Sequence, residues 1–138
     1  MAAFLLKTEP STYSFDDLVR DKKTVWDGVS NALALKHLRS VKKGDTIFVY
    51  HTGDEKQVVG LAVADSDPFP DPKLQDPRRV VVRIRAGKPF PFAVPLSTFR
   101  SDPILAATDL VRLPRLSVIP MTATQERRLV ERSGLEAK

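Results

Sequence analysis

The residues best suited to bind a small ligand lie together at positions 24–31, a segment that contains the only tryptophan of the chain. Trp26 offers a flat apolar face, while Asp27 and Asn31 supply a carboxylate and a carboxamide close to it. An aromatic face beside hydrogen-bonding groups suits the recognition of a flat molecule with polar edges, such as a nucleobase. A buried tryptophan whose neighbours only shape a turn would have the same local sequence. The segment is predicted to connect two elements of secondary structure. Its tryptophan can be interpreted either as part of a ligand-binding site or as a structural residue.

Catalytic chemistry finds less support in the short sequence patterns. Residues 28–32 resemble the G-x-S-x-G turn of a serine hydrolase, with alanine in the last place. That turn requires a buried strand before the serine and an acid and a histidine after it, on a longer chain than this one. The glycine patterns that bind nucleotide phosphates are absent. Ser30 is therefore interpreted as a helix cap, and neither hydrolysis nor dinucleotide redox chemistry is expected.

Metal and cofactor chemistry is also disfavoured by composition. The chain has no cysteine, and its only histidines are His37 and His51. Because neither histidine has an evident acidic partner at ligand spacing, we expect no metal site and no cofactor. His51 ends a predicted interior strand, where it either donates to a ligand or binds a loop carbonyl, and we favour the second, structural role.

Positive charge is concentrated in the second half of the chain. The net charge is +5; residues 1–69 carry 9 Lys/Arg and 10 Asp/Glu, whereas residues 70–138 carry 13 and 7. A surface that faces a polyanion requires such an excess, although many domains of this size are basic without binding nucleic acid. Arg79, Arg83 and Arg85 fall on one side of a predicted strand. Because alternate strand positions lie ~6–7 Å apart, these arginines form either a phosphate track or the solvated face of the strand.

The remaining sequence predicts short strands with helices inserted early and late. Strands are predicted at residues 2–7, 46–51, 57–65, 79–85 and 115–118, with an antiparallel hairpin between the second and the third. Helices are predicted from Ser14, over 30–39, as short turns at 95–99 and 103–110, and from Thr122, whose capping box with Gln125 opens a helix that closes near Gly134. Residues 67–77 form a loop punctuated by prolines. This order favours an α+β fold, a bent barrel of five to six mostly antiparallel strands with helices packed outside.

Length and hydropathy indicate one domain outside the membrane. The chain has 138 residues and 42% hydrophobic content, enough for one continuous core. No apolar run approaches the ~20 residues that span a bilayer, and the short apolar run at positions 4–6 lacks a basic lead and a cleavage site. We therefore expect a monomeric protein of the cytoplasm, or of the nucleus in a eukaryote, with no membrane partner.

Short motifs spread over almost the whole chain are shared, in the same order, with one known family. The motifs are Lys7-Thr8-Glu9-Pro10, Tyr13-Ser14, Trp26-Asp27-Gly28-Val29-x-Asn31, Gly44-Asp45, Tyr50-His51-Thr52, Val59-Gly60, Pro70-Asp71-Pro72 and Arg115-Leu116-Ser117-Val118. Together they resemble the EVE domain family. The resemblance implies one PUA-like domain over residues 1–138, related to the YTH domains that read methylated adenine in RNA. It also implies a non-catalytic module that reads a methylated or hydroxymethylated base in DNA or RNA.

The resemblance also implies which residues build the pocket. Carried onto this chain, they are Thr8, Glu9, Trp26, Gly28, Val29, Asn31, His51, Thr52, Leu116 and Ser117. Trp26 would stack on the base, and Asn31, Thr8 and His51 would hydrogen-bond its edge. Val29 and Leu116 would contact the added group. Phosphate contacts are expected from Arg79, Arg83, Arg85 and Arg115.

The chain departs from the family pattern at several of these positions. Thr8 and Thr52 stand where the family usually has serine, and Ser30 stands where it usually has arginine. The family often has a tryptophan near the position of Arg79. A second aromatic wall is therefore missing unless Phe69 from the proline loop replaces it.

Three other classes of function stay open at this point. Glu9 or Asp27 could serve as acid and base in an enzyme that acts on modified nucleobases or nucleosides. A sensor of free nucleosides would need the same pocket without a polynucleotide. A protein-interaction adaptor would keep Trp26 as a purely structural residue. The expected partner is a nucleic acid that carries a modified base.

Overall fold

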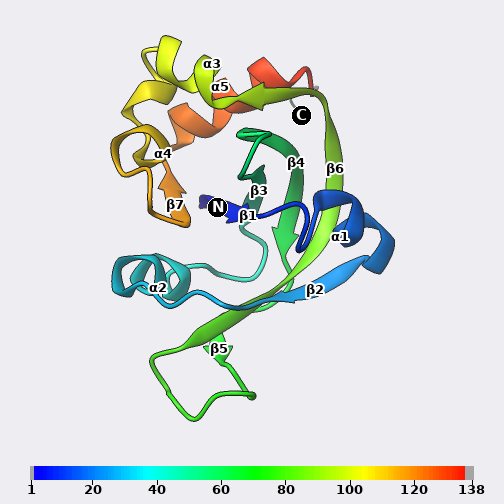
Figure 1. Ribbon diagram of the computed structural model, residues 1–138, viewed down its shortest axis with the longest axis vertical. Helices are drawn as coiled ribbons and strands as arrows, with labels where there is room; N and C mark the ends of the chain where they lie inside the picture. Colours follow the sequence, from blue (N-terminus) through cyan, green and yellow to red (C-terminus); the bar gives the residue numbers. More distant parts are fainter. Residues whose placement is uncertain (1, 136–138) are drawn as a thin grey trace.

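The computed structural model describes residues 2–135 of the 138-residue chain. In this range it contains seven strands, five α-helices and one 3-10 helix (Figure 1). The strands are β1 (Ala3–Thr8), β2 (Lys23–Trp26), β3 (Thr46–His51), β4 (Gln57–Ala64), β5 (Phe69–Pro70), β6 (Val80–Pro95) and β7 (Val118–Met121). The helices are α1 (Phe15–Asp21), α2 (Ala32–Arg39), α3 (Leu96–Ser101), η1 (Leu105–Ala107), α4 (Asp109–Arg112) and α5 (Ala123–Ser133). None of these helices combines the length and the apolar character that crossing a membrane requires.

One mixed sheet joins the strands in the order β2-β6-β4-β3-β1-β7, with β5 paired to the start of β6. β1 and β3 run parallel, and the other pairs are antiparallel. Helices lie around the bent sheet: α1 packs against β2 and β6, α2 packs against β6 and β7, and the later helices lie together near the end of β6 (Figure 1). The α+β class is confirmed, but the sheet stays open and has seven strands where five or six were expected.

The two strands that the sequence did not predict are held by pairing with β6. β2 was expected to be a connection, and β5 lies inside the proline-punctuated loop. β2 has four residues and β5 has two, too few for a pattern of alternation to be visible. β6 itself begins where a strand was predicted and continues to Pro95. Trp26 therefore ends an edge strand instead of lying in a connection.

The predicted hairpin is confirmed as β3 and β4, which pair in antiparallel register from Thr46 opposite Val63 to His51 opposite Gln57. The small residues of β4 have a packing role. A side-chain carbon at Gly60 would overlap the Phe15 ring, so glycine at this position lets α1 lie directly against the sheet.

The cap predicted at Ser14 and the capping box predicted at Thr122 are confirmed, and the structure shows a capping box at Ser14 as well. Ser14 caps α1 and exchanges hydrogen bonds with Asp17, and Thr122 caps α5 and exchanges them with Gln125. The last helix ends at Gly134, whose φ of +78° is the left-handed conformation that glycine favours.

Two local predictions are wrong. The cap of α2 is Asn31 instead of Ser30, because Asn31 Oδ1 accepts the backbone N–H groups of Leu33 and Ala34. The strand expected at 115–118 is displaced to β7, since pairing with β1 begins only at Val118.

Candidate functional site

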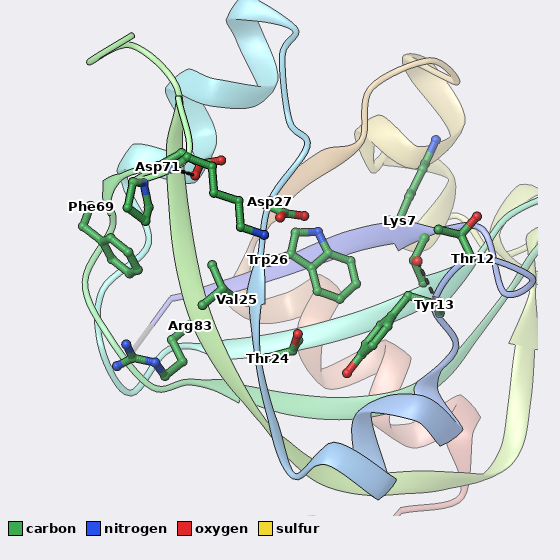
Figure 2. Close-up of a pocket in the computed structure, with 13 residues that line it drawn as sticks. Lys7, Thr12, Tyr13, Thr24, Val25, Trp26, Asp27, Phe69, Asp71 and Arg83 are labelled. Carbon is green, nitrogen blue, oxygen red and sulfur yellow. Dashed lines mark hydrogen bonds between the residues drawn. The ribbon is translucent and has the colours of Figure 1, made fainter. Parts of the chain in front are cut away.

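A hollow of about 640 Å³ opens beside Trp26 (Figure 2). It is lined by Lys7, Thr8, Thr12, Tyr13, Thr24, Val25, Trp26, Asp27, Phe69, Asp71, Pro72, Lys73 and Arg83. The indole is 8% exposed, so most of it packs against the protein while part of it forms the wall of the hollow. The volume lies within the usual range of small-molecule sites.

The edge strand β2 divides this hollow into two lobes, because successive side chains of a strand point to opposite faces. Val25 pairs with Arg83, so these two side chains share one face, and Trp26 lies on the other. Phe69 pairs with Val81, two positions before Arg83, and therefore shares the face of Arg83. We call the side of the hollow next to Trp26, with Lys7, Thr12, Tyr13 and Thr24, the Trp26 lobe, and the side next to Phe69, with Val25, Asp71 and Arg83, the Phe69 lobe (Figure 2). Thr8, Pro72 and Lys73 also line the hollow. Phe69 thus does not supply the second aromatic wall opposite Trp26.

The Trp26 lobe is bounded by hydroxyl groups and one ammonium group. Thr8 Oγ1 donates to the Tyr13 carbonyl oxygen at 2.7 Å, and the Tyr13 hydroxyl donates to Asp21 at 2.9 Å. Burial, helped by the Asp21 carboxylate, raises the pKa of Tyr13, so its phenol remains a neutral donor. Lys7 Nζ donates to the Pro114 carbonyl oxygen at 2.8 Å, and burial lowers its pKa. An ammonium group has three N–H donors, so Lys7 retains donors for a ligand.

The Phe69 lobe combines an aromatic ring with a guanidinium group. The guanidinium carbon of Arg83 lies 5.9 Å from the centroid of the Phe69 ring, within the range of a cation–π contact. Asp71, 7% exposed, accepts the Lys73 backbone N–H through Oδ1 at 2.9 Å. This bond fixes the turn after β5 and thereby the place of Lys73. Val25 is 40% exposed and adds apolar surface between the two strands.

The arginines expected to follow a phosphate chain do not form one track. They are Arg79, Arg83, Arg85 and Arg115. Arg79 Nε donates to the Val29 carbonyl oxygen at 3.0 Å, and Arg85 Nε lies 3.5 Å from Asp65. Arg115 lines a different hollow. Arg83 lines the Phe69 lobe and, within residues 2–135, has no ion-pair partner.

A second, smaller hollow contains two of the residues expected to contact the base. It measures about 390 Å³ and is lined by Asn31, Leu33, Leu113, Pro114, Arg115 and Leu116. The side-chain oxygen of Asn31 caps α2, as described above, so it is not free to accept from a base. Of the residues carried over from the family, Thr8 and Trp26 line the larger hollow, and Asn31 and Leu116 line the smaller one.

The other carried-over residues lie outside both hollows. They are Glu9, Gly28, Val29, His51, Thr52 and Ser117. Thr52 Oγ1 donates to the Thr8 carbonyl oxygen at 3.3 Å and lies 3.4 Å from a Glu9 carboxylate oxygen. The Lys7 backbone N–H donates to the Ser117 carbonyl oxygen at 3.1 Å. Gly28 has a φ of +81° and turns the chain after β2, and Val29 is buried. These residues hold the end of β1 and the turn after β2 in place behind the Trp26 lobe.

His51 uses both ring nitrogens inside the protein. Nε2 accepts the backbone N–H of Phe15 at 3.0 Å, so the proton of the neutral ring lies on Nδ1, which donates to Glu55 at 2.9 Å. This hydrogen bond lowers the pKa of Glu55. His51 is 7% exposed and its partners lie within the protein, but they are the Phe15 N–H and the Glu55 carboxylate instead of the expected loop carbonyl.

In residues 2–135 the His, Asp and Glu side chains form no group of three that could hold a metal ion.

The EVE domain model matches residues 2–132. The chain belongs to the EVE domain family. It is 34% identical over 80 residues to thymocyte nuclear protein 1 of Homo sapiens, a match that covers 49% of this chain and 36% of that protein. The chain thus spans about a third of the length of the curated relatives that it matches.

Solved structures agree with this membership. Rpa0253 of Rhodopseudomonas palustris has a TM-score of 0.94 and 34% identity, and the match covers 100% of this chain and 97% of the other. Human THYN1 in complex with DNA containing 5-methylcytosine has a TM-score of 0.89 at 23% identity, covering 99% and 100%. At that identity the likeness shows the fold alone. The PUA-like architecture expected from the EVE motifs is confirmed.

Several wall residues of this EVE domain were not predicted as site residues. They are Lys7, Thr12, Tyr13, Thr24, Val25, Asp71, Pro72 and Lys73. Lys7, Tyr13, Asp71 and Pro72 stand inside the family motifs, which offered a signal for them. Asp27 was considered beside Trp26 and lines the hollow. Thr24 and Val25 line the hollow only because β2 pairs with β6, and no local sequence pattern predicts that pairing.

His51→Ala is expected to reduce the free energy of unfolding by about 1–3 kcal/mol, because the buried Phe15 N–H loses its acceptor. Urea titration of the variant and the parent measures the loss. Ligand affinity of the Trp26 lobe should change by less than about twofold. A variant as stable as the parent, or one that folds but no longer binds, would contradict the structural role.

Proposed function

We propose that this EVE domain is a non-catalytic module that binds nucleic acid carrying a modified base, and that the Trp26 lobe receives the base. The observation that carries the proposal is the exposed part of the Trp26 indole on the wall of a hollow of about 640 Å³. Human THYN1, which has the same fold, binds DNA containing 5-methylcytosine. Cationic groups of Lys7, Lys73 and Arg83 around the hollow favour a polyanionic ligand.

The wall of the hollow provides contacts for a base with an exocyclic amino group. Asp27 follows Trp26 directly and can accept from the N4 amino group of a cytosine, a pairing that carboxylates make in DNA recognition. Lys7 supplies donors for ring nitrogen or carbonyl acceptors. Thr8 has its hydroxyl proton committed to Tyr13, so it contributes an acceptor oxygen.

Stacking alone gives this site little net affinity for a base in a duplex. A base stacked on an aromatic side chain contributes ~1–3 kcal/mol, while extruding a paired base costs a few kcal/mol. Burial of one methyl group adds ~0.8 kcal/mol, about a fourfold preference. Net affinity must therefore come from phosphate contacts, and single-stranded ligands should bind more tightly than duplexes.

A panel of short single strands that differ in one central base tests the proposal. The panel contains cytosine, 5-methylcytosine, 5-hydroxymethylcytosine and N6-methyladenine, and binding is followed by fluorescence anisotropy. One modified base should bind a few-fold more tightly than its unmodified parent. Nucleoside mass spectrometry after incubation should recover the modified base unchanged. Equal binding of the whole panel would contradict the reading of a modification, and steady conversion of the base would favour the enzyme alternative.

Salt dependence is a separate prediction. If Arg83 and Lys73 each meet one phosphate of a single strand, log K should fall with log salt with a slope of about −1.4. Titrations between about 50 and 300 mM NaCl measure the slope. A slope near zero would exclude phosphate contacts and favour a sensor of free nucleosides.

A further inference from the structure

We infer that the Phe69 lobe binds the nucleotide adjacent to the one whose base enters the Trp26 lobe. The inference rests on the proposed function and adds to it a second subsite. Its occupant is defined by its chemistry, an aromatic base attached to a phosphate. The domain would then engage two neighbouring nucleotides at once and would require a polynucleotide.

Because β2 separates the two lobes, a ligand that fills both lobes must have two parts. Trp26 and Phe69 lie on opposite faces of the sheet, as the strand register dictates and Figure 2 shows, so no single heterocycle stacks on both. Yet one hollow of about 640 Å³ continues past β2, which is the last strand of the sheet. A ligand that fills both lobes must bend around this edge. A sugar–phosphate backbone does so when it splays two bases apart, as in the recognition of single strands.

The Phe69 lobe has the surface that a base requires. Bases stack on aromatic rings and on guanidinium planes, and here the two lie together at 5.9 Å in Phe69 and Arg83. Val25 exposes 40% of its surface on the same face, where a base would cover it. An aromatic ring, a cation and an apolar residue on one face match a stacked base better than they match a purely solvated strand.

The charges of this lobe suit a phosphate. Arg83 has no ion-pair partner within residues 2–135, whereas Arg85, two positions later on the same face, lies 3.5 Å from Asp65. Lys73 adds a second cation from the turn after β5. The one carboxylate of the lobe, Asp71, directs Oδ1 to the Lys73 backbone N–H at 2.9 Å. Arg83 on β6 lines the Phe69 lobe, and Lys73, in the turn that the Asp71 bond holds in place, adds a second cation to the wall of the hollow.

The test uses a single-stranded DNA of about nine nucleotides with one central 5-methylcytosine. Two further versions of this strand carry an abasic site at the nucleotide directly 5′ or directly 3′ of the 5-methylcytosine. For the parent, one of the two abasic strands should bind about fivefold or more weakly, as expected for the loss of one base–aromatic stack. Phe69→Ala should weaken the intact strand by a similar factor. Phe69→Leu keeps the apolar packing and removes the flat face, so it should show the same loss in a protein of near-parental stability.

The decisive measurement combines the two changes. If the missing base is the one that stacks on Phe69, its removal should lower the affinity of the Phe69→Leu variant by less than about twofold, because that variant has already lost the stacking interaction. The preference for 5-methylcytosine over cytosine should stay within about twofold of the parent. The assignment would be overturned if Phe69→Leu and the abasic site had additive effects on affinity at both the 5′ and the 3′ position. It would also be overturned if the variant lost the preference for 5-methylcytosine over cytosine.

Matched controls separate this subsite from general effects. Arg83→Ala should weaken the intact strand and reduce its salt slope by about 0.7, whereas Arg85→Ala, on the same strand and face, should change neither appreciably. Phe92→Ala removes an aromatic side chain that is 70% exposed and outside the hollow, and should leave binding unchanged. If Arg85→Ala matches Arg83→Ala, the Phe69 lobe is not a specific phosphate subsite.

The result also distinguishes the inference from the proposed function. A parent protein that prefers the modified strand, with no effect of Phe69→Leu, would overturn the second subsite and leave the Trp26 lobe in place. A parent protein that binds none of the strands would overturn both.

Discussion

Trp26→Ala is expected to weaken binding of a 5-methylcytosine single strand by about 5- to 150-fold. The indole is the stacking surface of the Trp26 lobe, and one base–aromatic stack contributes ~1–3 kcal/mol. Unlike a change in the Phe69 lobe, this one should also reduce the preference for the modified base, because the modified base is the one that is stacked. Anisotropy titrations with the methylated and unmethylated strands measure both effects.

Stability has to be controlled in this experiment, because Trp26 is 8% exposed and belongs to the core. Truncating a buried aromatic side chain to alanine costs about 3–5 kcal/mol, a large part of the stability of a small domain. Trp26→Leu fills more of the space and still removes the ring, so it should bind as weakly as Trp26→Ala while unfolding at a higher urea concentration. A folded Trp26→Leu protein that binds like the parent would show that the indole is not the stacking surface.

The single tryptophan also reports directly on the lobe that contains it. Its fluorescence has no other tryptophan source in this chain, so a base placed against the indole should change the emission in proportion to occupancy. Phe92→Ala serves as the matched control, since it alters an exposed aromatic side chain away from the hollow and should leave the response intact. Emission that no nucleic acid alters would favour the adaptor with a structural tryptophan.

The sequence predicted best the elements that local interactions determine. The caps at Ser14 and Thr122 depend on residues three positions away, and the β3–β4 hairpin depends on alternation and a short turn. Trp26 was singled out for a local reason as well, its place beside polar groups, and it lines the larger hollow. Such features need no knowledge of distant segments, which is why they could be predicted.

The parts that the sequence did not predict depend on long-range pairing. Asn31 and Leu116 were expected to meet Trp26 in one pocket, but they line a separate hollow. Phe69 was considered as the wall facing Trp26, yet the register of β5 against β6 turns it to the other face. A shift of one residue in either pairing would exchange the faces, and nothing in the local sequence sets that register.

Asp102→Ala is expected to lower the free energy of unfolding by about 3–5 kcal/mol, the usual cost of removing one partner of a buried ion pair. Asp102 is 1% exposed and joins two elements. Its Oδ1 accepts the backbone N–H of Ile104 at 3.0 Å, and its Oδ2 accepts from Arg132 at 2.9 and 3.1 Å. Arg128 lies 3.5 Å from the same oxygen. Loss of the carboxylate therefore releases α5 from the segment after α3, as urea titration should show.

Two further variants show which carboxylate oxygen of Asp102 contributes more to the free energy of unfolding. Asp102→Asn keeps an acceptor for the Ile104 N–H and loses the charge, so it should be less destabilising than Asp102→Ala. Arg132→Ala removes only the partner of Oδ2, and its side chain is 47% exposed, so its effect should be the smallest of the three. Because these residues lie outside the hollow, strand binding by each folded variant should match that of the parent. An Arg132→Ala protein less stable than Asp102→Ala would contradict this order.

The same carboxylate should make stability depend on pH. Burial by itself raises the pKa of Asp102, but the hydrogen bonds from Arg132, Ile104 and Leu105 and the charge of Arg128 outweigh it, and the pKa is held below its usual value. A carboxyl group with a lower pKa in the folded state than in the unfolded state contributes stability above the unfolded pKa of about 4, and that contribution is lost as the pH falls toward the folded pKa. Parent and Asp102→Asn should therefore differ most in unfolding free energy above pH 5 and converge as the pH falls below 4. A difference that stays constant over this range would mean that the stabilisation arises from the packing of Asp102 and not from its charge.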